Sequence, residues 1–138
     1  MYASAGQSSE QIGYLLEYQK SKSNGFKQLN NQANTGFDIK DFMGKIKLST
    51  RQEAKIPLYL EFKYHYYDET SNETYLGITK KKFSVNPYDR YAISQGDQMN
   101  ADHQQFMLTH VIDFSKQLKI FTNAIIIHFQ EIGINPMM

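Results

Sequence analysis

Apolar side chains recur at alternating steps of four and three residues along the segment that precedes the C-terminal end. The positions that carry the repeat are Met107, Val111, Phe114, Leu118, Phe121, Ile125, His128 and Ile132. Steps of this kind place their residues along one side of an α-helix. The pattern therefore predicts a long apolar helix over about 101–132, roughly 48 Å in length at ~1.5 Å per residue.

Residues at the two ends of this segment are typical of helix termini. Asn100 suits an N-cap, and Gly133 suits the left-handed position that follows a last helical turn. The run Ala124–Phe129 is an alternative strand, because isoleucine and phenylalanine have high β-propensity. The helix is favoured because the repeat continues through that run without a break.

Polar and apolar residues alternate one by one in the middle of the chain, as expected for strands with one wet face. This alternation covers Lys45 to Ser49 and, most clearly, Ile56 to Tyr67. Thr74 to Val85 is interpreted as a return strand, with Tyr66 opposite Leu76. The predicted fold class is α+β: an antiparallel sheet over about 42–85, with a central hairpin at 56–85, packed on the long C-terminal helix.

The first part of the chain is predicted to stand apart from this body. Ser8 and Gln11 form a capping-box pattern, which favours a short helix at about 9–21. A polar stretch from Ser21 to Gly36 follows and is typical of a linker or an extended arm. The predicted organisation is an N-terminal helix and polar arm over 1–36, and a single α+β domain over 37–138.

Composition narrows the class of protein. The 138-residue chain is 41% hydrophobic and contains no cysteine, which excludes disulfides, thiolate nucleophiles and cysteine-ligated metal sites. No secretory signal is visible at the start, and the uncharged run at 120–130 is shorter than the ~20 residues that a transmembrane helix needs. The sequence predicts an intracellular protein without a transmembrane segment.

Motifs for catalysis or cofactor binding are absent from the sequence. There is no phosphate-binding glycine loop, no His-Glu-x-x-His motif and no nucleophile elbow. His110 and Asp113 lie one helical turn apart in the predicted helix, but no third metal ligand follows at a suitable spacing. We therefore expect a non-enzymatic protein with no cofactor and no metal.

Basic and aromatic residues on the predicted wet face indicate an alternative function, which is nucleic-acid binding. Lysines that meet phosphates and rings that stack on bases are how single-strand binders work. Acidic residues such as Glu61 and Glu73 interrupt the set, and the net charge is only +1. The residues that would contact nucleic acid are Lys63, Tyr67, Lys80, Lys81, Lys82 and Arg90.

The predicted helix has more apolar surface than one sheet covers, and this sets the functional expectation. The favoured hypothesis is a structural or assembly subunit of a larger complex, bound to other protein subunits, in a homo- or hetero-oligomer, through its long helix and N-terminal arm. The predicted interface residues are Ile112, Ile120, Ile126 and Ile127. The alternative is a small single-stranded nucleic-acid-binding module, an OB-like sheet plus a C-terminal helix.

Overall fold

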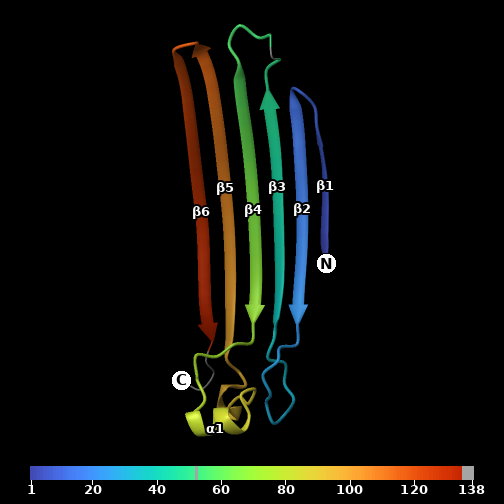
Figure 1. The fold of residues 1–138 in the computed structure, drawn as a ribbon, viewed down its shortest axis with the longest axis vertical. Coiled ribbons are helices and arrows are strands. Elements are labelled where there is room, and N and C mark those ends of the chain that lie inside the picture. The colour runs from blue at the N-terminus through green and yellow to red at the C-terminus, as the bar shows by residue number, and fades with distance from the viewer. Residues whose placement is uncertain (52, 135–138) are drawn as a thin grey trace.

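The computed structural model describes residues 1–51 and 53–134 and consists of one antiparallel sheet with six strands in the order β1-β2-β3-β4-β5-β6. The strands are β1 (Tyr2–Ser8), β2 (Ile12–Ser23), β3 (Phe37–Ser49), β4 (Leu58–Ser71), β5 (Gln98–Ser115) and β6 (Leu118–Ile134). Figure 1 shows them side by side in a single elongated layer. Each strand therefore pairs only with its neighbours in the sequence.

The predicted α+β class is wrong, because the segment predicted as the long helix is a strand hairpin. β5 and β6 are joined by a turn at Lys116 and Gln117, and the side-chain oxygen of Ser115 accepts the N–H groups of Gln117 and Leu118 at 3.2 and 3.1 Å. Strand residues such as Phe106 and Ile126 are directly opposite one another in this pair. The strand alternative for Ala124–Phe129 is the correct one.

The short helix predicted at about 9–21 is also wrong, because this segment is β2. Apolar residues at Leu15 and Leu16 lie on opposite faces of the strand, and neighbouring residues that are both apolar hide the alternation of a strand. β3 begins at Phe37, the first residue of the predicted main domain, and pairs with β2 from Ser23 to Ile12. β1 adds to the other side of β2.

The strand predicted over Ile56 to Tyr67 is correct and forms most of β4. Its predicted hairpin partner is wrong: Tyr66 pairs with Phe42 of β3 and with Gln104 of β5, not with Leu76. The segment after β4 instead forms a loop, the short helix α1 (Lys80–Val85) and a 3-10 turn at Ala92–Ser94. Within the range 42–85 that was predicted as sheet, the strands therefore end at Ser71. The next strand of the sheet is β5.

Loops 24–36 and 72–97 lie together at one end of the sheet, and we call them the end cap (Figure 1). Two backbone hydrogen bonds of Gln28 join these loops. The N–H of Gln28 donates to the oxygen of Tyr88, and the oxygen of Gln28 accepts from the N–H of Arg90. Leu29, in this cap, and Ala101 are the buried hydrophobic residues of the described chain. The sheet itself has no covering layer within the described residues.

The described part of the chain contains no helix with the length and apolarity needed to cross a bilayer.

Candidate functional site

Pairing across the sheet places most of the large apolar side chains on one side of it. Residues directly opposite in an antiparallel pair share a face, so the register assigns each residue to one side. We call this side the apolar face. Its members on the five strands β2 to β6 include Tyr14, Leu16, Phe42, Ile46, Leu48, Leu58, Leu60, Phe62, Tyr64, Phe106, Leu108, Ile112, Ile120 and Ile126.

Aromatic rings form the middle of the apolar face. The ring centroids of Tyr64 and Phe106 are 4.8 Å apart, and that of Phe42 lies 6.4 Å from Tyr64 on the other side. Phe62 extends the row, 6.3 Å from Phe106. Such cross-strand contacts hold the rings in a fixed row, so the face is a preformed surface.

Nothing in the described chain packs on this face. Ile46, Phe62 and Leu108 remain 50%, 43% and 41% exposed, although all three lie away from the outer edges of the sheet. Five strands at ~4.8 Å and about eight residues along each strand give an area of roughly 24 by 27 Å. This is about 650 Å², larger than the largest apolar patch of a typical monomer.

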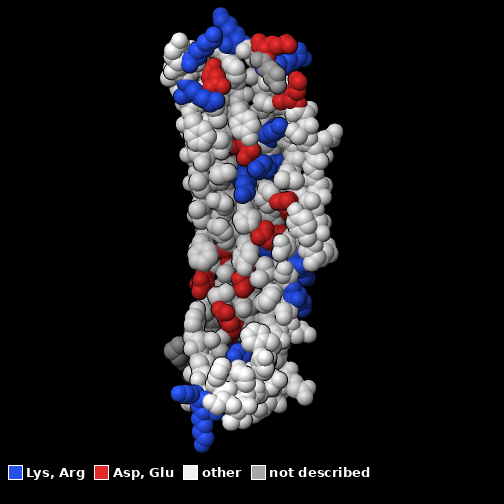
Figure 2. All heavy atoms as spheres, viewed as in Figure 1, with Lys and Arg blue, Asp and Glu red and all other residues white. Residues whose placement is uncertain are grey.

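The opposite side, which we call the polar face, carries most of the charged side chains of β3 and β4. Figure 2 shows Lys, Arg, Asp and Glu along the middle of the molecule, where these strands lie. His65 Nε2 is 3.0 Å from Asp41 Oδ1, and Lys45 Nζ is 3.5 Å from Glu61 Oε1. Both contacts join a side chain of β3 to a side chain of β4.

Two tyrosines on β4 each donate a hydrogen bond to a carboxylate of this polar face. The Tyr59 hydroxyl donates to Glu61 at 2.5 Å, and this bond, with burial, raises the pKa of Tyr59 to about 12. Burial and a hydrogen bond to Glu69 likewise raise the pKa of Tyr67 to about 12. Both phenols therefore stay protonated at neutral pH and act as hydrogen-bond donors.

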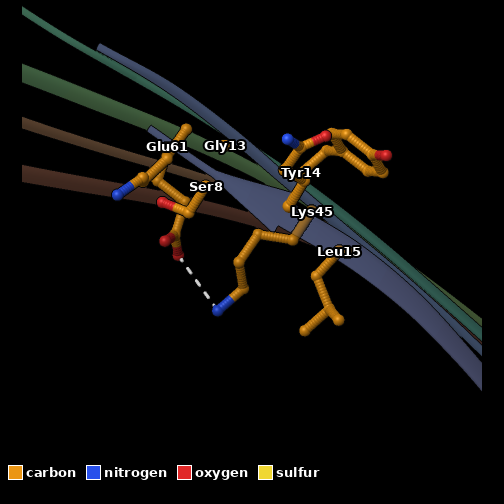
Figure 3. A pocket seen from close by; sticks show the side chains of 9 residues that line it. Ser8, Gly13, Tyr14, Leu15, Lys45 and Glu61 are labelled. Carbon is orange, nitrogen blue, oxygen red and sulfur yellow. Dashed lines mark ion pairs between the residues drawn. The ribbon is translucent and has the colours of Figure 1, made fainter. Parts of the chain in front are cut away.

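A hollow of about 440 Å³ opens beside β1 and β2 (Figure 3). It exists partly because Gly13 has no side chain: a Cβ there would lie 2.7 Å from Cε of Lys47. The amino group of Lys45 points to Glu61, as the dashed line in Figure 3 marks. The lining holds no histidine, and its carboxylate, Glu61, already has a lysine and a tyrosine as partners.

No three His, Cys, Asp or Glu side chains among residues 1–51 and 53–134 are placed to hold a metal ion.

The predicted nucleic-acid residues are divided between the polar face and the end cap. Lys63 and Tyr67 lie on the polar face of β4, whereas Lys80, Lys81 and Lys82 belong to α1 at the end of the sheet (Figure 1). Lys82 Nζ pairs with Asp89 at 2.8 Å. Arg90 is 6% exposed. The alternative function is not supported, because it also requires a C-terminal helix that is absent from the described chain.

Three of the four predicted interface residues lie on the apolar face. Ile112 and Ile120 are directly opposite one another on the apolar face, and Ile126 lies on the same face of β6. Ile127 is on the other side of the sheet. The subunit role assigned to a long helix and an N-terminal arm is nevertheless wrong, because the predicted helix is the β5–β6 hairpin and most of the predicted arm is the loop 24–36 of the end cap.

Sequence reasoning missed the contribution of β2, and of Phe106 and Leu108 in β5, to the apolar face. The signal was present as alternation in two segments that were interpreted as helices. In β5, the residues Phe106, Leu108 and Ile112 all occupy even-numbered positions and therefore lie on one face. In β2, Tyr14 and Leu16 also occupy even-numbered positions.

No family model, curated protein or solved structure matches this chain.

Proposed function

We propose that the protein is a non-enzymatic, self-associating β-sheet protein, in which the apolar face of one copy packs against the apolar face of a second copy. The observation that carries the proposal is a preformed apolar face on five strands, which no layer of the described residues covers. Burial of such a face in a sandwich of two sheets ~10 Å apart is the usual way that a sheet of this kind is stabilised.

The dimensions of the apolar face support a second copy as the occupant. Its area of roughly 650 Å² is close to the ~800 Å² that each partner contributes to a specific interface. Lys and Glu on the polar face favour water, so the polar face remains outside in this arrangement. The apolar face itself is free of charged side chains from Ile46 to Phe42 in β3 and from Leu58 to Tyr66 in β4, so two copies meet without burying an unpaired charge.

Charge placed on either side of one strand tests this proposal. Leu108 lies on the apolar face of β5, and its neighbour Thr109 lies on the polar face. Leu108→Asp would bury a carboxylate in the sandwich, and we expect it to halve the mass measured by light scattering. Thr109→Asp is the matched control and is expected to leave the mass of the assembly unchanged.

Wild-type protein should have a mass that is an even multiple of the 16.1 kDa chain. Circular dichroism should show the same strand content for the wild type and both variants. A folded wild-type monomer at micromolar concentration, or equal masses for the Leu108→Asp and Thr109→Asp variants, would contradict the proposal.

A further inference from the structure

The outer edge of β6 is open along its whole length within the described residues, and its side chains are apolar on both faces. Strand β6 has one neighbour, β5, on its inner side. Ile126 is 70% exposed on the apolar face, and Phe121 and Phe129 are 64% and 59% exposed on the polar face. In Figure 2 the margin of the molecule over the middle of β6 is free of charge.

Sheet edges that stay single usually carry a device that prevents strand pairing, such as proline, a bulge or an inward-pointing charge. β6 has no proline, and the single shift in its register with β5 lies at the turn, between Asp113 and Ser115. Its only charged residues are Lys119 and Glu131, near its two ends. The edge between them is therefore a long, regular and unprotected template for another strand.

The backbone of alternate residues in β6 points to this open edge. The N–H of Asp113 donates to the oxygen of Pro57, on the β4 side, at 3.0 Å. Because backbone groups alternate in direction along a strand, even-numbered residues of β5 point to β6 and bond to even-numbered residues there, as at Ile112 and Ile120. The N–H and C=O groups of odd-numbered residues in β6, among them Ile125, face outwards.

We propose that β6 of one copy pairs antiparallel with β6 of a second copy, with Ile125 opposite its own counterpart on the two-fold axis. This register is selected by side-chain complementarity. It sets Lys119 opposite Glu131 of the second copy, and Phe121 opposite Phe129. If the register shifted by two residues, Lys119 would lie opposite Gly133 in one direction or opposite Phe129 in the other, and its pairing with Glu131 would be lost. The outward backbone groups of Ile125 make the central pair a hydrogen-bonded one.

The edge contact is independent of the sandwich in the proposed function. A two-fold axis perpendicular to the sheet leaves both apolar faces on the same side, where each pair of sheets can still pack on another pair. Closed point-group symmetry with both contacts gives four chains, and either contact alone gives two.

The absence of cysteine from the chain allows a direct test of the register. Ile125→Cys would place two thiols on Cα atoms ~5.5 Å apart, within the range of a disulfide. Under mild oxidation we expect this variant to form a covalent dimer of twice 16.1 kDa. Ile127→Cys is the matched control, because its counterpart lies about 13 Å away along the strand. It should crosslink only when mixed with the Asn123→Cys variant. Failure of Ile125→Cys to crosslink, or equal crosslinking of Ile127→Cys alone, would overturn the register.

A second measurement separates this inference from the sandwich. In the Leu108→Asp background the β6 pair should remain, so the protein should have the mass of two chains and Ile125→Cys should still crosslink. Addition of Ile125→Lys, which sets two ammonium groups against one another on the two-fold axis, should reduce that mass to one chain. If Leu108→Asp alone is already a monomer, the edge pairing is wrong and the sandwich stands. If Leu108→Asp leaves the wild-type mass unchanged, the sandwich is wrong.

Discussion

Tyr64 and Phe106 are directly opposite one another across β4 and β5, with their ring centroids 4.8 Å apart on the apolar face. The two rings are tilted by 39°. They link β4 to β5 through side chains as well as through the backbone.

This contact predicts a measurable coupling between the two rings. In a double-mutant cycle with alanine, the interaction between Tyr64 and Phe106 should contribute about 1 kcal/mol to the free energy of unfolding. Urea unfolding at one fixed protein concentration measures it. The control cycle pairs Tyr64 with Phe129, which lies on the opposite face, and should give a coupling near zero. Equal couplings in the two cycles would contradict the assignment of faces.

Arg90 is predicted to be the residue that holds the end cap together. Its guanidinium donates to the side chain of Ser94 at 2.9 Å and to the backbone oxygens of Ser94 and Asn72. Burial lowers the pKa of Arg90, and the nearby carboxylate of Asp97 opposes that change. Arg90→Met should lower the free energy of unfolding by about 3 kcal/mol, because it removes three hydrogen bonds and leaves the half-buried carboxylate of Asp97 without its nearby cation.

Arg90→Lys should recover less than half of this loss, because an ammonium group cannot reproduce the planar fork of donors. Lys80→Met in the exposed α1 is the control and should change the free energy of unfolding by less than about 0.5 kcal/mol. An Arg90→Met variant as stable as the wild type would show that the cap does not depend on this side chain.

Alkaline pH should destabilise the protein through Tyr59 and Tyr67. Their folded-state pKa values are about 12, above the ordinary value of 10.0 that applies when the chain is unfolded. The folded state therefore holds these protons more tightly, so the stabilisation is fully present below about pH 10 and is lost as the pH rises towards 12. Urea unfolding across this range measures the fall.

A charge-neutralising variant identifies the cause for Tyr59. Glu61→Gln should lower the pKa of Tyr59 towards 10, as followed by the ring resonances of labelled tyrosine, because the carboxylate that favours the protonated phenol is gone. Glu10→Gln removes a carboxylate from the β1–β2 turn and should leave that titration unchanged. An unaltered Tyr59 titration in the Glu61→Gln variant would contradict this explanation.

Gly36 is predicted to be intolerant of any side chain. A Cβ at this position would lie 1.9 Å from the backbone oxygen of Ser23, and a backbone atom cannot move aside as a flexible side chain can. Gly36→Ala should cost about 2 kcal/mol or more in the free energy of unfolding. The control is Gly133→Ala in β6, where a Cβ meets nothing within 4 Å, and this variant should be neutral or slightly stabilising. Equal melting temperatures for the two variants would contradict the close approach.

The sequence was sufficient for β4, in which the alternation of apolar and polar residues is clearest. In β4, Leu60 and Phe62 alternate with Glu61 and Lys63, and this pattern has a single interpretation. In β6 it fails, because both faces are apolar: Phe121 and Ile125 lie on one side, and Ile120 and Ile126 on the other. With both faces apolar, the strand period of two is hidden, and the remaining spacing matches that of a helix.

The turn between β5 and β6 was the second missing signal. Hairpin turns are usually recognised by glycine, asparagine or proline, and Lys116-Gln117 contains none of these. Ser115 supplies the missing contacts through its side chain. For the candidate site, the sequence placed Ile112, Ile120 and Ile126 at a surface but could not place Phe42 or Leu16 beside them, because this required the order and register of six strands.

The sequence of strands across the sheet also determines where local unfolding begins. Since every strand touches only its sequence neighbours, the sheet is a linear array, and its free energy is close to a sum of nearest-neighbour terms. Local opening should therefore proceed inwards from the two margins, and amide protons of β3 and β4 should exchange with deuterium more slowly than those of β1 and β6. Contact between copies along β6 would slow amide exchange in β6, so the gradient of exchange rates would be reversed on the β6 side of the sheet and unchanged on the β1 side.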